Sequence, residues 1–163
     1  MTWNWLTSTF PPLQQLISFL QKASKTNDVV KKQVIIELRD NLNLFKEAYE
    51  QTATYDNLID LLSNDAYRNA IKENFSFKKI RNGKIENRHI KDERNSRYLG
   101  WTSEKLLDKI DEKIQALKNL KKLNSGSVEK INSKVTLKIS NLYFRMKLMA
   151  DFIYGGEEKD DEV

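Results

Sequence analysis

Cysteine is absent from the 163-residue chain, and histidine occurs only once, as His89. Without cysteine the protein cannot form a disulfide framework, hold zinc through thiolates or use a thiol nucleophile. With a single histidine, any Ser-His-Asp arrangement would have to be built around His89. The composition therefore predicts a protein that is not an enzyme, with no catalytic residue, no metal site and no cofactor.

Glycine and proline are also scarce, with 5 and 2 residues respectively. Sandwiches and barrels use both residues at their many turns, so their scarcity favours an all-α fold. No run approaches the ~20 apolar residues that a membrane-spanning helix needs. The first charged side chain is Lys22, so the basic start of a secretory signal is missing. We expect a cytoplasmic protein without a membrane partner.

Apolar residues recur at intervals of three and four along most of the chain, which is typical of helices with one buried face. Two long helices are expected over residues 102–123 and 128–154, and their short link makes them antiparallel neighbours. With the shorter helices before them, they predict one antiparallel bundle of four to five helices over residues 1–154. Gly155 and Gly156 should end the last helix, leaving residues 155–163 as a disordered acidic tail.

Residues 74–101 lose the helical periodicity and contain the dipeptide Asn82-Gly83. Asn-Gly is a strong hairpin signal, because both central residues of a type I′ turn need positive φ. A two-residue turn there would pair Ile80 with Ile85. An irregular loop is the alternative, because the flanking residues are poor strand formers. We expect either a β-hairpin or an irregular insertion in this part of the chain.

Positive charge is concentrated in the same insertion. Of the seven arginines in the chain, four fall within seventeen residues, and residues 78–97 carry eight basic and three acidic side chains. Basic residues interleaved with aromatic ones can contact phosphates and stack on unpaired bases. A solvated charged loop is the competing interpretation. The candidate nucleic-acid contacts are Lys78, Lys79, Arg81, Lys84, Arg88, Lys91, Arg94 and Arg97.

The last helix is apolar on nearly all sides. Besides its main stripe it carries a second one, formed by Phe144, Leu148 and Phe152. Such a helix is either buried centrally or covered by a partner. A bundle of four or five helices rarely surrounds one helix completely, so we predict a partner interface at the second stripe. The aromatic residues Trp3 and Trp5 suit either packing onto the bundle or docking to a partner.

Three functions compete on these observations. The leading one is a non-catalytic interaction module, or small subunit of a larger assembly, that docks through its C-terminal helix and N-terminal aromatics to a protein partner or a second copy. The alternative is binding of RNA or DNA through residues 78–97. The third is a nuclease or metalloenzyme centred on His89. We expect His89 to be a solvated histidine in a basic loop, since one Glu-x-x-His motif cannot build a di-metal site.

Overall fold

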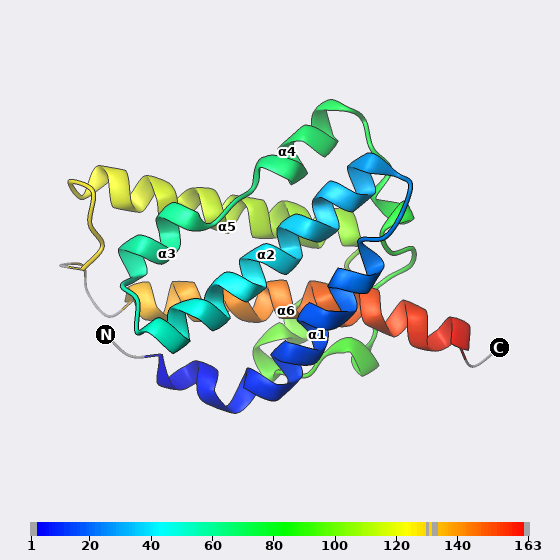
Figure 1. The fold of residues 1–163 in the computed structure, drawn as a ribbon, viewed down its shortest axis with the longest axis horizontal. Helices are drawn as coiled ribbons and strands as arrows, with labels where there is room; N and C mark the ends of the chain where they lie inside the picture. The colour runs from blue at the N-terminus through cyan, green and yellow to red at the C-terminus, as the bar shows by residue number, and fades with distance from the viewer. Residues whose placement is uncertain (1–2, 130, 132–133, 162–163) are drawn as a thin grey trace.

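The computed structural model describes residues 3–129, 131 and 134–161, and its α-helices pack into one bundle (Figure 1). Within these residues there are six α-helices and no β-strand. The six α-helices are α1 (Phe10–Ala23), α2 (Val29–Gln51), α3 (Tyr55–Leu61), α4 (Asp65–Lys72), α5 (Ser103–Leu123) and α6 (Lys134–Asp161). Short 3-10 helices complete the fold: η1 (Asn4–Thr9), η2 (Phe77–Lys79), η3 (Asn87–His89) and η4 (Glu93–Tyr98).

The prediction of an all-α protein is therefore confirmed, with more helices than the expected four to five. The helices begin where short polar side chains can accept backbone N–H groups. Asp28 caps α2, and Thr54 and Thr102 cap α3 and α5. Helix α5 was expected over residues 102–123, and its apolar stripe of Leu107, Ile110, Ile114 and Leu117 is buried.

Helix α6 lies in the middle of the molecule, behind α2 in Figure 1. It packs against α1, α2 and α5, and also against η3 and η4. Every residue from 142 to 150 is buried, including the two basic residues of this stretch, Arg145 and Lys147. Burial on all sides explains why the amino-acid pattern of this helix has no polar face.

The structure resolves residues 74–101 as an irregular segment that holds η2, η3 and η4. The Asn82-Gly83 hairpin does not form: Gly83 has a φ of +88°, but Asn82 keeps a negative φ, and a type I′ turn needs both positive. Ile85 pairs instead with the far end of the segment. Its N–H donates to the Trp101 carbonyl at 2.9 Å, and its carbonyl accepts from the Gly100 N–H at 2.8 Å. Residues 85–101 thus form a closed loop, joined at its two ends by these hydrogen bonds.

Two predicted boundaries of the last helix are wrong. Helix α6 begins at Lys134 and not near Val128. Asp56 of α3 accepts hydrogen bonds from the Ser127 hydroxyl and the Val128 N–H, both at 2.7 Å, and these bonds hold residues 127–128 against α3. At the other end, Gly155 and Gly156 lie inside α6. A Cβ on Gly155 would come within 2.6 Å of the His89 ring, and one on Gly156 within 2.7 Å of the Arg81 guanidinium. These glycines make room for side chains that cross the helix. The predicted disorder of residues 155–163 stays a prediction, because residues 162–163 and the side chains from 157 onward lie outside the described part.

The N-terminal aromatics pack onto the bundle. The Trp3 indole donates to the Ala53 carbonyl at 2.9 Å and lies 4.9 Å from the ring of Tyr55. The Trp5 ring lies 5.4 Å from Tyr143 of α6. Trp3 is buried and Trp5 half-buried, so these residues complete the core at one end of α6. Of the two uses that the sequence left open, the structure shows packing within the chain.

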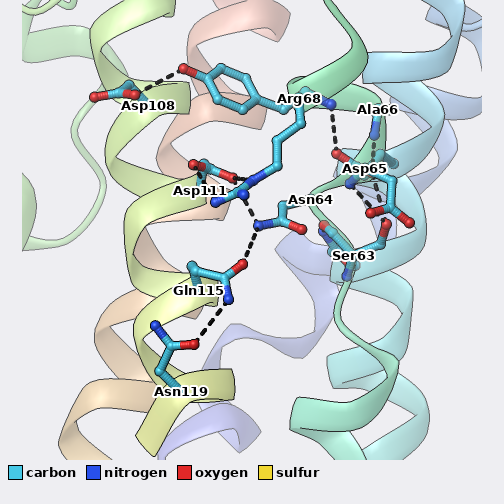
Figure 2. Close-up of polar contacts among 12 residues, drawn as sticks. Ser63, Asn64, Asp65, Ala66, Arg68, Asp108, Asp111, Gln115 and Asn119 are labelled. Carbon is cyan, nitrogen blue, oxygen red and sulfur yellow. Dashed lines mark hydrogen bonds and ion pairs between the residues drawn. The ribbon is translucent and has the colours of Figure 1, made fainter. Parts of the chain in front are cut away.

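A polar cluster fastens α4 to its neighbours. Glu37 of α2 accepts hydrogen bonds from the N–H groups of Ala66 and Tyr67 in the first turn of α4, at 2.7 and 3.1 Å. On the other side, Arg68 forms an ion pair with Asp111 of α5 at 2.9 Å (Figure 2). Burial, together with the hydrogen bond to Asp108, raises the pKa of the Tyr67 hydroxyl. The carboxylates of Glu37, Asp108 and Asp111 thus each accept at least one hydrogen bond.

Candidate anion-binding cleft

Three of the four clustered arginines hold the irregular segment onto α6. Arg81 donates to the Phe152 carbonyl at 2.9 Å, and Arg88 to the Gly155 carbonyl at 3.1 Å. The Arg94 guanidinium lies over the Phe144 ring, 4.0 Å from its centroid. Their clustering in the sequence therefore has a structural cause, because guanidinium groups can bind carbonyls and cover aromatic faces at once.

The lysines of the basic segment are exposed. Lys78, Lys79, Lys84 and Lys91 all point to solvent, although Lys79 lies 3.8 Å from Asp28 and Lys91 donates to the Arg88 carbonyl. Of the eight candidate nucleic-acid contacts, Arg81, Arg88 and Arg94 therefore contact α6, and Arg97 lies over the ring of Tyr98, 5.1 Å from its centroid. The role of the exposed lysines in binding nucleic acid stays a prediction.

The predicted partner interface is buried inside the chain. Phe144, Leu148 and Phe152 are 5%, 1% and 0% exposed, so they offer no surface to a partner in this structure. Trp5 lies 6.2 Å from the ring of Phe144, Arg94 lies over the same ring, and Arg81 lies over the ring of Phe152. The irregular segment, which has no apolar period of its own, thus lies on that side of α6, and a partner interface at these residues stays a prediction.

Arg97 lines a cleft between α5 and α6 that the sequence analysis did not identify. The cleft has a volume of about 320 Å³, and Arg97 and Tyr98 of η4 belong to its lining. Its lining includes no carboxylate among the residues that the structure describes. The basic residues that line it are Arg97, Lys109, Lys113, Lys138 and Arg145, and we call this site the basic cleft.

Arg145 is the least exposed of the five cations. The residue is 3% exposed, and its Nε donates to the Tyr98 hydroxyl at 2.7 Å. No carboxylate in the described part of the chain pairs with its guanidinium. The acid nearest to this group of cations is Glu112, which lies on the rim, is exposed, and contacts Lys109 and Lys113 at 3.3 and 3.8 Å. Burying a charge without a counter-ion costs several kcal/mol, so a buried arginine normally has an anionic partner.

A signal for this cleft was present in the sequence. Lys109 and Lys113 are four residues apart on α5, so they lie on the same face, where like charges repel. Lys138 and Arg145 are seven residues apart and share a face of α6. The local clustering of arginines drew attention to residues 78–97, whereas the basic cleft combines charges that are far apart in the chain.

His89 is buried at 2% exposure, so the expectation of a solvated histidine was wrong. Burial and the nearby Arg88 and Arg81 lower the pKa of His89 to about 4. The described residues contain no group of three or more histidines, aspartates and glutamates that could hold a metal ion. None of the described helices is long and apolar enough to cross a membrane.

No protein-family model matches this chain, and no curated protein and no solved structure matches it either.

Proposed function

We propose that the protein binds the phosphate backbone of a nucleic acid in the basic cleft. The observation that carries this proposal is Arg145, a buried guanidinium with a hydroxyl but no carboxylate partner at the floor of a cavity. A guanidinium offers paired N–H donors that match two phosphate oxygens. A bound phosphate would supply the missing counter-ion.

The arrangement of the other cations suits a chain of phosphates. Lys109 and Lys113 are one turn apart on α5, about 6 Å along its axis. Lys138 and Arg97 belong to other elements that line the same cleft. Several cations along a cleft favour a ligand with repeated negative charges over a single anion. The proposed role as a protein-docking module had its support in the second stripe of α6, and burial of that stripe removes this support.

Binding of a fluorescent single-stranded RNA, followed by anisotropy at several salt concentrations, tests the proposal. Three or four neutralised phosphates predict a slope of about −2 to −3 in log K against log salt. A triple variant with Lys109→Gln, Lys113→Gln and Lys138→Gln removes three positive charges from the rim and leaves Arg145 in place. It should flatten the slope by about two units.

Two matched variants remove the same charge elsewhere. One carries Lys22→Gln, Lys25→Gln and Lys72→Gln, which lie on α1, after α1 and on α4. The other carries Lys78→Gln, Lys79→Gln and Lys84→Gln on the basic segment. Both should keep the slope of the natural protein within about half a unit. Absence of binding at low salt would refute the function, and a larger loss from the basic-segment variant would place the contact there instead.

A further inference from the structure

His89 presents a proton donor that nothing in the described structure uses. Its Nδ1 accepts a hydrogen bond from the Glu86 N–H at 2.9 Å, so the proton of the neutral ring resides on Nε2. That Nε2 is the one buried side-chain polar atom without a hydrogen-bond partner in the described part of the chain. An unmade hydrogen bond on a buried donor costs about 1–3 kcal/mol, and such groups in native proteins often have a functional cause.

The position of the ring is set by its neighbours. His89 packs edge to face on Phe152 of α6, with ring centroids 5.0 Å apart. Gly155 permits this approach, because a side chain there would collide with the ring atoms Cδ2 and Nε2. Glycine inside a helix costs about 1 kcal/mol relative to alanine. The helix therefore accepts a destabilising residue at the one place where the imidazole lies against it.

A cavity of about 530 Å³ adjoins His89, on a different side of α6 from the basic cleft. The walls near α1 are formed by Pro12, Gln15 and Leu16, and Tyr154 and Gly155 contribute from α6. We call this space the His89 cavity. Its volume lies within the range of small-ligand pockets.

The charges that line the His89 cavity indicate what it can hold. Arg88, Lys91 and Lys147 are positive, and Asp151 is the negative residue among the lining side chains. Lys147 and Asp151 form an ion pair at 3.1 Å, with side chains 9% and 11% exposed, so they neutralise each other. Arg88 also forms an ion pair with Glu86, at 3.1 Å, so Lys91 is the lining cation without a carboxylate partner among the described residues. The lining cations still outnumber the lining carboxylate, beside a neutral N–H donor.

We propose that the His89 cavity binds a phosphate monoester of about nucleotide size. A phosphate monoester carries a charge of −1.5 to −2 near neutral pH, and a lining with more cations than carboxylates attracts such an anion. Its oxygens accept hydrogen bonds from the His89 Nε2–H, and Arg88 and Lys91 neutralise its charge. The organic part lies against the walls formed by Leu16 and Tyr154. Because the ring is a neutral donor with no free lone pair, His89 binds and positions the phosphate and is not a general base.

Nuclear magnetic resonance can test this directly, since the only histidine of the chain gives a single set of imidazole signals. Adenosine 5′-monophosphate serves as the probe, with adenosine and succinate as separate arms. The nucleotide should shift the His89 Nε2–H signal with a saturable titration. Adenosine lacks the phosphate, and succinate carries the same charge on two carboxylates, so neither should titrate. Equal binding of adenosine or of succinate would refute the assignment to a phosphate.

Variants locate the binding. Lys91→Gln removes an exposed charge at the rim and should weaken nucleotide binding about tenfold, whereas Lys84→Gln, an equal change on the same segment outside the cavity, should not. Gly155→Ala displaces the ring and should abolish the shift of the imidazole signal. The triple lysine variant of the basic cleft should keep full nucleotide binding, so failure of one site is distinguishable from failure of the other. Unchanged affinity in Lys91→Gln would overturn the proposal.

Discussion

The two polar faces of α5 differ in how their charges are satisfied. Toward α4, Asp108 and Asp111 accept hydrogen bonds from Tyr67, Asn64 and Arg68. Toward α6, Lys109 and Lys113 line the basic cleft with Arg145, and among the described residues the acid paired with these lysines is the exposed Glu112. A polar region whose donors and acceptors match stabilises the fold by itself. A region with an excess of one sign needs something from outside, and for this reason we assign function to the second face.

The largest effect on stability is expected on the satisfied side. Glu37→Ala leaves two backbone N–H groups of α4 and the Ser63 hydroxyl without their acceptor. Each buried donor that loses its partner costs about 1–3 kcal/mol, so the free energy of unfolding should fall by about 2–4 kcal/mol. Urea unfolding measures this change. Glu47→Ala on the same helix, where the carboxylate is exposed, should cost less than about 0.5 kcal/mol. Equal effects of the two substitutions would contradict the importance of the cluster.

The next largest effect on the free energy of unfolding should come from protonation of His89 as the pH falls. Its pKa of about 4 in the folded protein lies below the ordinary value near 6.5, so the unfolded chain binds a proton more readily. The contribution of the neutral, buried His89 to the stability of the fold is therefore complete above about pH 6.5 and is lost as the pH falls toward 4. We expect a loss on the order of 2 kcal/mol across this window in urea unfolding.

The variant His89→Gln isolates the contribution of the histidine from that of the carboxylates. It should remove the part of the pH dependence between pH 6.5 and 5, while the carboxylate-driven decline at lower pH remains. If the natural protein and the variant lose stability in parallel over pH 6.5–5, His89 does not titrate as the structure implies.

The smallest effect on stability is expected at Arg145, and this substitution distinguishes most clearly between the two polar faces of α5. Replacing a buried charge that lacks a carboxylate with an apolar side chain of similar length is often neutral or stabilising. Arg145→Met should change the free energy of unfolding by less than about 1 kcal/mol, while affinity for single-stranded RNA falls at least tenfold. A variant that loses stability but retains its RNA affinity would make Arg145 a structural residue.

The sequence predicted the regular part of this fold better than the irregular part. The helix expected over residues 102–123 follows from the local spacing of apolar residues, and the structure has it as α5, Ser103–Leu123. The arginines near residue 90 and the aromatic stripe of α6 were each interpreted as a surface for another molecule. In the structure these arginines lie against the aromatic stripe of α6. Contacts between residues about 50 to 70 positions apart leave no periodic pattern in the sequence, so the sequence did not predict them.

The candidate sites were missed for a related reason. Composition drew attention to charge density within short stretches, whereas Arg97, Lys113 and Arg145 come together only through tertiary packing. His89 was interpreted from its charged neighbours in sequence, although the partners that bury it, Phe152 and Gly155, belong to α6. Satisfaction of hydrogen bonds is a property of the folded structure, and neither a cation excess nor an orphaned Nε2 can be counted from the sequence.

The closed loop from Ile85 to Trp101 has a consequence for the order of events during synthesis. Its ends can meet as soon as they have left the ribosome, because the backbone of Ile85 forms its hydrogen bonds with Gly100 and Trp101, both of which belong to the loop. The surface on which the loop rests is made some 50 residues later, when Phe144, Phe152 and Gly155 are translated. At about 5–20 residues per second, this leaves several seconds in which Arg88 lacks the Gly155 carbonyl and Arg94 lacks the Phe144 ring that they contact in the folded protein. During that interval the nascent chain displays a concentration of positive charge that the finished protein largely directs onto its own central helix.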